Sequence, residues 1–537
     1  MSASREKKKR KEEAELGISK EQLRKKEELK AKKRRNRSIA VISAILVVFI
    51  AALCVYNDAI PFFTGRLLKE ATAVEVGSEK FSAADFNYYF NSFAAQYKQN
   101  YGEYLSYLGV NTDDFLNQPY DSTQTWGDLI RGFAIEQIEE IGILAAEAEK
   151  EGYKLSDEEA AKIDEYFAQL DSYASNMGMD VDDYYEKQFG NGVTQEVYRR
   201  NVIRSTLADS FRKYKQDSFT YTDDQLEAYY NENRKTVDVA DYRYFFVSGI
   251  AGKDEDEDKA MEDALNDAKE FVDRLGKGEK FSDLCVEYAM DISRERYEED
   301  ENESLKREAT YESTLEAFRD WVFDDARRPG DVTYVEGDPS QSYTGYFVVE
   351  FISRERAEYN TVDYRSILSA VTVDDEDAYN ENNADNPDAQ PYDEYVDAAW
   401  VKAQSDIESL VAKWQSNGGD EEEFAKLAAT DSDDSDAYAS GGLVEQATKS
   451  QADPAIEDWL FNPARKPGDY EVFETERGMR LVYFVGFNLP RWKAQVTNTL
   501  RANDYDSWFE SVSANYKLKE KKFGMHYAMK PSESSSI

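Results

Sequence analysis

The amino-acid sequence predicts a mixed α+β protein of several domains that carries one N-terminal transmembrane helix. Three observations support this prediction. Its 537 residues exceed the length that a single hydrophobic core usually organises. An uncharged apolar segment follows a basic leader near the N-terminus. The second half of the chain contains the same order of strand and helix patterns twice. We therefore expect a transmembrane helix, a helical domain, two tandem α/β domains and a C-terminal helix.

The N-terminal segment has the charge pattern of a membrane anchor. Residues 1–37 contain 16 Lys and Arg against 7 Glu, whereas the whole chain has a formal net charge of -42. Residues 38–57 follow without a charged residue and reach the about 20 residues needed to cross a bilayer. The positive-inside rule places the leader in the cytoplasm and the rest of the chain on the extracytoplasmic side. The alternative is a cleaved signal peptide, which usually has a shorter apolar core and a small-residue cleavage site.

Residues 65–236 predict a helical domain, because apolar side chains recur there every three or four positions. Capping signals at Ser156 and Thr222 mark the starts of two of its helices. The first long helix begins near Ser82 and has an aromatic face. This face includes Phe86, Tyr89, Phe90, Phe93 and Tyr97. Two interpretations of the face stay open: the core of a helix bundle, or a partly exposed groove that binds peptides.

The second half of the chain is a tandem duplication. The strand pattern DYRYFFV from Asp241 returns as DYRSILS from Asp363, and WVFDDARRPGD from Trp321 returns as WLFNPARKPGD from Trp459. A long amphipathic helix and a shorter one lie between these segments in both copies. We expect α/β domains over two ranges and a helix and a tail after them. The predicted boundaries are 237–356, 357–489, 490–520 and 521–537.

The composition excludes several classes of function. The acidic net charge opposes nucleic-acid binding, because phosphates would be repelled. The only histidine is His526, near the C-terminus, which excludes the usual Ser-His-Asp and Cys-His centres. Cys54 and Cys285 form no ligand cluster, and no phosphate-binding glycine motif occurs. We therefore expect no metal and no cofactor.

Residues 73–235 resemble the N-terminal chaperone domain of the SurA/PrsA foldases. The segments that carry this resemblance include VEVGSEKFSAADF, YRRNVIRSTLA and TDDQLEAYYNEN. The repeated domains resemble parvulin-type peptidyl-prolyl isomerases, through GGL at Gly441 and the Pro-Gly-Asp turns. The resemblance implies a foldase whose partners are unfolded or newly exported polypeptides. It also implies that the C-terminal helix folds back onto the helical domain and buries Trp508.

The resemblance also indicates where the isomerase sites would lie. Parvulins usually carry one histidine in the first strand, another in the last strand, and a phenylalanine between them. The corresponding residues are Tyr244, Phe347 and Phe318 in the first domain and Ser366, Arg480 and Ile456 in the second. None offers the paired donor and acceptor of a neutral imidazole. We expect peptide-binding domains with weak or no isomerase activity. The alternatives are an active isomerase and a cell-envelope scaffold that reuses the fold.

Overall fold

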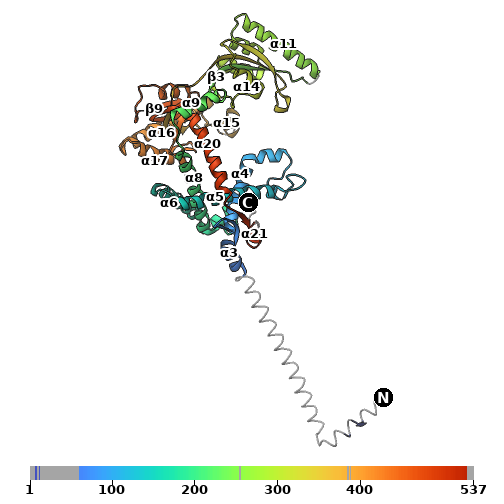
Figure 1. Cartoon of the computed structure of the whole chain (residues 1–537), viewed down its shortest axis with the longest axis vertical. Helices are drawn as coiled ribbons and strands as arrows, with labels where there is room; N and C mark the ends of the chain where they lie inside the picture. The colour runs from blue at the N-terminus through green and yellow to red at the C-terminus, as the bar shows by residue number, and fades with distance from the viewer. Residues whose placement is uncertain are drawn as a thin grey trace. The chain divides into compact units, whose positions relative to one another are not determined.

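The structure is a computed structural model that describes residues 7–8, 11, 60–252, 256–383, 386 and 389–528. The predicted membrane helix at 38–57, most of the leader and the end of the tail lie outside these ranges. Among the described residues, no helix is long and apolar enough to cross a membrane. The chain divides into two compact units (Figure 1). Unit 1 extends to Ser218 and resumes at Asp504, and unit 2 comprises Phe219–Asn503.

Unit 1 is mostly helical and contains one small sheet. Its helices before the division are α3 (Ile60–Glu70), α4 (Ala83–Tyr107), α5 (Trp126–Glu151), α6 (Asp157–Asn176), α7 (Val181–Phe189) and α8 (Gln195–Ser218). Its strands are β1 (Thr72–Val76), β2 (Glu79–Ser82) and the C-terminal β11 (Leu518–Glu520), with α21 (Lys522–Tyr527) after them. The sheet is antiparallel in the order β11-β1-β2, and Val74 pairs with Glu520. The C-terminal segment therefore completes the sheet that the N-terminal strands begin.

Capping boxes start three of the helices of unit 1. Ser82, Thr125 and Ser156 each accept a hydrogen bond from the backbone N–H three residues later, and the acidic side chain there accepts one from the backbone N–H of the cap residue. These reciprocal bonds satisfy backbone groups that the first helical turn leaves free. The same motif at Thr222 starts α9 (Asp223–Glu232) in unit 2. The helix starts predicted at Ser156 and Thr222 are confirmed.

A buried carboxylate ties two helices of unit 1 together. Asp85, 1% exposed, is the third residue of α4. It accepts hydrogen bonds from the Ser82 amide at 2.7 Å, from the Arg200 guanidinium at 2.7 Å and from the Asn201 side-chain amide at 2.8 Å. Arg200 and Asn201 lie on α8. The Arg200 guanidinium therefore balances the charge of Asp85, and the bonds to Asp85 fix the contact between α4 and α8. A buried carboxylate is tolerated only with such partners.

The last long helix, α20 (Arg491–Ser513), begins in unit 2 and ends in unit 1. In unit 1, Tyr505 is 6% exposed, and the indole of Trp508 lies 6.1 Å from the Phe211 ring. The Lys215 ammonium lies 4.9 Å from that indole. Trp508 is half-buried, whereas we expected it to be buried, because it lies at the margin of the core.

Unit 2 starts with a short helical segment. Helices α9 and α10 (Arg234–Val237) pack with the first half of α20 through a small apolar cluster. At its centre, the Tyr230 and Trp492 rings lie 5.5 Å apart. We expected residues up to 236 in the helical domain, but their contacts place those from Phe219 onward in unit 2.

Two four-stranded antiparallel sheets form the body of unit 2. In the first α/β domain, strands β3 (Val239–Ser248), β4 (Leu305–Ala309), β5 (Val332–Glu336) and β6 (Gly345–Glu355) have the order β4-β3-β6-β5. Its helices are α11 (Glu257–Gly276), α12 (Phe281–Tyr288), α13 (Asp291–Glu299) and α14 (Glu316–Val322). Figure 1 labels β3, α11 and α14 in this green to yellow part.

The second α/β domain has the equivalent order β8-β7-β10-β9. Its strands are β7 (Asn360–Ala370), β8 (Leu443–Ala447), β9 (Tyr470–Thr475) and β10 (Gly478–Pro490). Its helices are α15 (Glu376–Asn383), α16 (Tyr392–Ser416), α17 (Glu421–Asp431), α18 (Ala437–Ser440) and α19 (Pro454–Leu460). The predicted duplication is confirmed, and the protein is a mixed α+β chain with one helical unit.

The two domains share details at the level of single hydrogen bonds. The Asp241 carboxylate accepts the Glu308 amide at 2.7 Å, and the Asp363 carboxylate accepts the Gln446 amide at 2.7 Å. Both amide donors have a left-handed backbone, with φ of 50° at Glu308 and 51° at Gln446. Non-glycine residues adopt this conformation rarely, so the aspartate stabilises an irregularity in the neighbouring edge strand.

Candidate functional site

A pocket of about 400 Å³ opens in the second α/β domain. It lies among β7, the segment before α19, α19 itself and the turn from β9 to β10. The residues that line it include Tyr364, Ala452, Pro454, Ile456, Thr475 and Arg480. Apolar groups from the loop and from α19 face polar groups from the strands. This mixture suits a short peptide segment with one apolar ring and several backbone carbonyl groups.

Arg480 and Ser366, which we placed at the two histidine positions, meet at this pocket. The Arg480 guanidinium donates a hydrogen bond to the Ser366 hydroxyl at 2.9 Å. The Asp434 carboxylate lies 3.4 Å from the same guanidinium. Ser366 is 6% exposed, so its hydroxyl supports Arg480 from behind. The pocket therefore presents the Arg480 guanidinium, partly balanced by Asp434, in place of a neutral imidazole, and Asp453, Glu476 and Arg477 also line it.

The apolar side of the pocket contains Ile456, the residue at the position of the family phenylalanine. Ile456 is 3% exposed and packs in the domain core with Trp459 and Leu460. Tyr364 lies two residues before Ser366 on the same strand, and burial raises the pKa of its hydroxyl. That hydroxyl therefore stays protonated at neutral pH and can donate a hydrogen bond to a carbonyl group.

The corresponding positions of the first α/β domain form a packed aromatic cluster. The Phe318 and Phe347 rings lie 5.4 Å apart, and Tyr244 lies 5.7 Å from Phe318 and 6.3 Å from Phe347. Phe318 and Phe347 are each 1% exposed. Rings at these separations make edge and offset contacts that stabilise a core. The structure brings the three predicted residues together, with Phe318 and Phe347 in the hydrophobic core and Tyr244 partly buried against it.

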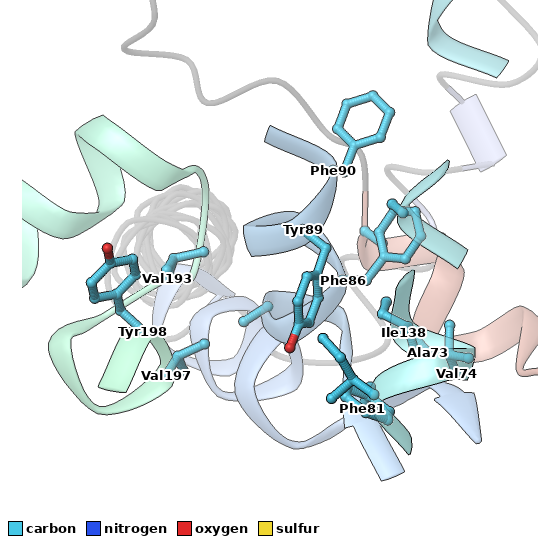
Figure 2. Close-up of a cluster of buried hydrophobic side chains, with 14 of the residues drawn as sticks. Ala73, Val74, Phe81, Phe86, Tyr89, Phe90, Ile138, Val193, Val197 and Tyr198 are labelled. Carbon is cyan, nitrogen blue, oxygen red and sulfur yellow. The ribbon is translucent and has the colours of Figure 1, made fainter. Parts of the chain in front are cut away.

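The aromatic face of α4 divides into a buried part and an accessible part. Figure 2 shows Phe86, Tyr89 and Phe90 in the core of unit 1, where they are 0%, 4% and 6% exposed. Phe93 and Tyr97 are only partly buried at the edge of that core. The bundle-core interpretation therefore holds for the first three side chains, because α5 and the small sheet cover them.

Beyond Tyr97, the same helix carries tyrosines that stay accessible. Tyr101, Tyr104 and Tyr107 are 49%, 60% and 86% exposed, and the Tyr97 and Tyr101 rings lie 4.8 Å apart. We call these three residues the tyrosine surface. These three tyrosines continue the spacing of the buried aromatic residues. Periodicity alone therefore did not distinguish the exposed side chains from the buried ones.

Sequence reasoning missed Tyr364, which lines the pocket, and Asp434, which contacts the lining residue Arg480. Asp434 lies in the acidic run TDSDDSD from Thr430, and its carboxylate lies 3.4 Å from the Arg480 guanidinium. Tyr364 was part of the repeated DYR pattern, but its alternation with Ser366 along one strand could have placed it on the same face. An arginine in a buried strand could likewise have indicated that a carboxylate partner was needed.

The chain is similar to one protein family and to two foldases. Residues 392–486 match the model of the rotamase family, the PPIC-type PPIase domain. The foldase protein PrsA of Caldanaerobacter subterraneus subsp. tengcongensis is 24% identical over 220 residues, covering 41% of this chain and 56% of that protein. The foldase protein PrsA of Halalkalibacterium halodurans is 26% identical over 238 residues, covering 42% of this chain and 66% of that protein.

The chain thus spans less than two thirds of the length of either PrsA protein. A crystal structure of the peptidylprolyl isomerase PrsA from Bacillus cereus is 21% identical and covers 52% of this chain and 74% of that chain. Its TM-score of 0.23 is too low to support a conclusion about domain arrangement. The PPIC-type domain and the two similar foldases support the assignment of this chain to the PrsA/SurA-type foldase family.

Proposed function

We propose that this protein is a membrane-anchored, extracytoplasmic folding factor whose second α/β domain holds proline-containing segments of unfolded polypeptides. The observation that carries the proposal is the pocket in which Arg480, supported by Ser366, faces Ile456 and Tyr364. Apart from Tyr364, the residues that line the pocket fall within residues 392–486, the region that matches the PPIase family model. An apolar wall for a proline ring and donors for backbone carbonyl groups are the chemistry that such a segment needs.

The same pocket supports binding with little catalysis. Prolyl isomerisation crosses a barrier of about 18–20 kcal/mol without breaking covalent bonds. It is accelerated only if the twisted amide binds better than the planar one. Arg480 already donates to Ser366 and lies near Asp434, so its charge acts on planar and twisted carbonyl groups alike. We expect the second domain to speed cis/trans exchange of a proline peptide by less than about tenfold.

Binding and exchange can be measured separately on the full chain. NMR exchange spectroscopy of an Ala-Ala-Pro-Phe peptide reports the isomerisation rate. Changes in the chemical shifts of the peptide as protein is added report its affinity. Arg480→Gln should weaken binding of the peptide. Arg296→Gln is the control and should not weaken it, because Arg296 is an exposed residue of the first domain. Equal affinity for the wild type and Arg480→Gln would contradict the proposal, and a wild-type rate far above tenfold would favour the alternative of an active isomerase.

Restoring the family residues provides a further test of catalysis. The double variant Ser366→His with Arg480→His should raise the exchange rate above that of the wild type. Each single variant should do little, because the two groups act as a unit. The double variant should be faster because two imidazoles offer donor and acceptor groups without the fixed charge of Arg480. A double variant with the wild-type rate would show that the two positions do not limit catalysis.

The tyrosine surface of α4 supports a chaperone role for unit 1. Its exposed rings offer apolar area to unfolded chains without sequence preference, and Phe93 and Tyr97 adjoin it. The triple variant Tyr101→Ser, Tyr104→Ser and Tyr107→Ser should reduce the suppression of aggregation of a denatured model protein. Tyr334→Ser, an exposed tyrosine of the first α/β domain, is the control. Undiminished suppression by the triple variant would assign the holding activity to another surface.

Anchoring by residues 38–57 rests on the charge pattern of the sequence. Protease added to intact cells should digest the chain from outside and leave the basic leader with the apolar segment. A C-terminal region protected from that protease would overturn this topology. The third candidate, a scaffold of the cell envelope, predicts one stable stoichiometric partner in place of many transient clients.

A further inference from the structure

The two α/β domains contact each other directly beside the pocket. On strand β4 of the first domain, the Arg307 guanidinium donates to the Glu457 carboxylate of α19 at 2.7 Å. The adjacent Glu308 accepts a hydrogen bond from the Tyr359 hydroxyl, at the start of the second domain. Arg307, Glu308, Tyr359 and Glu457 form what we call the clasp.

The clasp holds the chain segment 448–457. The Lys449 amide donates to the Tyr359 hydroxyl at 3.1 Å, and the Ser450 amide donates to the Glu457 carboxylate. The Ser450 hydroxyl lies 3.3 Å from the Arg307 carbonyl oxygen and 2.6 Å from the Lys449 carbonyl oxygen, either of which can accept its hydrogen bond. The middle of this segment, Gln451 to Pro454, lines the pocket. Ile456, near its end, lines the pocket as well.

Two features indicate that this conformation depends on the clasp. Ser450 has a left-handed backbone with φ of 63°, which non-glycine residues keep only where their surroundings impose it. Glu457 is 6% exposed, and a buried carboxylate needs a charged partner. Arg307 supplies that partner from the other domain. The equivalent turns of the two domains both close on themselves: the Thr310 amide donates to the Ser313 hydroxyl at 2.9 Å, and the Thr448 amide donates to the Gln451 side-chain oxygen at 2.9 Å. In the second domain the contacts of the clasp are added to this turn.

We propose that the first α/β domain is a positioning element for the second, and that its Arg307 and Glu308 hold the wall of the peptide pocket in place. Its own site positions are filled by aromatic rings, and its edge strand bears on the wall of the neighbouring pocket. The effect on peptide binding rests on the proposed function, whereas the ordering of segment 448–457 does not.

Hydrogen exchange of the full chain tests the ordering. Arg307→Ala should speed exchange of the backbone amides of segment 448–457 by about tenfold, since their acceptors lose their support. Arg307→Lys should restore most of the protection. Arg296→Ala, which removes an exposed arginine paired with Glu303 at 3.3 Å within the first domain, is the control. Arg307→Ala also leaves the buried Glu457 carboxylate without its guanidinium and should lower the thermal midpoint. Unchanged exchange of the core amides of β7 and β10 in the same variant separates loss of position from loss of fold.

The same variants test the consequence for the pocket. Arg307→Ala should weaken binding of the Ala-Ala-Pro-Phe peptide by about three- to tenfold, and Arg307→Lys should recover it. Glu308→Gln serves if Arg307→Ala fails to fold. Unchanged exchange in segment 448–457 would overturn the proposal, as would faster exchange with unchanged peptide affinity. A wild-type chain that does not bind the peptide would contradict the proposed function, and the exchange rates would then decide the clasp alone.

Discussion

At the scale of single residues, the protein places charge inside its cores only where partners surround it. Asp85 in unit 1 and Glu457 in unit 2 are 1% and 6% exposed, and each accepts hydrogen bonds from a guanidinium and from a backbone amide. Removing a partner of such a group leaves an uncompensated ion in a poorly solvated site. These residues therefore determine which helices and segments meet.

Asp85→Ala should destabilise unit 1 by about 3–5 kcal/mol, because Arg200 and the buried Asn201 lose their shared acceptor. Urea unfolding followed by circular dichroism measures the change. Asp113→Ala is a matched control, since its exposed carboxylate pairs only loosely with Lys98 at 3.4 Å. A loss for Asp85→Ala as small as that of the control would show that the buried network contributes little.

Burial raises the pKa of Glu308, so this group introduces a pH dependence into unit 2. Its pKa is higher in the folded than in the unfolded state, so its contribution to stability falls as pH rises from about 4.3 through the folded pKa. Glu308→Gln cannot ionise and should lack this fall. Unfolding free energies of wild type and variant at several pH values should therefore diverge as pH rises. If the unfolding free energies of wild type and variant ran parallel with pH, Glu308 would not be the source of the pH dependence. Glu312→Gln, at an exposed residue, is the control.

At the scale of secondary structure, α20 contributes to the cores of both units. Its first half packs Trp492 against Tyr230 in unit 2, and its second half packs Trp508 against Phe211 in unit 1. Strand β11 follows it and pairs with β1. The C-terminal segment is therefore a structural part of unit 1, although it is more than 280 residues away from α8 along the chain.

Trp508→Ala should lower the stability of unit 1 by about 2–3 kcal/mol, below the usual cost of truncating a fully buried tryptophan. The reason is that Trp508 is only half-buried. Thermal unfolding of the full chain measures the change. Phe523→Ala removes a ring that is 62% exposed and should have little effect. Equal effects of the two variants would mean that the contact of α20 with α8 adds no stability.

At the scale of the whole molecule, the net charge of -42 and the tyrosine surface have different consequences. The charge keeps the protein soluble but repels acidic polypeptides, while exposed rings bind apolar segments of any chain. Suppression of aggregation should therefore survive a rise to about 0.5 M salt, which screens charges but not apolar contacts. Light scattering of a denatured model protein measures it. Loss of suppression at that salt concentration would indicate electrostatic association instead.

The sequence by itself determined the features that depend on nearby residues. The capping boxes at Ser156 and Thr222 were readable because their two partners lie three positions apart. The duplication was readable because strands and turns repeat the same letters, from Asp241 and Asp363 onward. The assignment of Ser366 and Arg480 to the histidine positions came from the resemblance to parvulins and stays a prediction.

Only the tertiary structure decided which side chains are accessible and which distant groups meet. Phe86 and Tyr101 belong to one periodic face, but α5 and the sheet cover the first and leave the second in water. Arg480 meets Asp434, and Arg307 meets Glu457, across 46 and 150 residues of sequence. Burial and ion pairing at such separations depend on how whole elements pack, and no local pattern of residues encodes that packing.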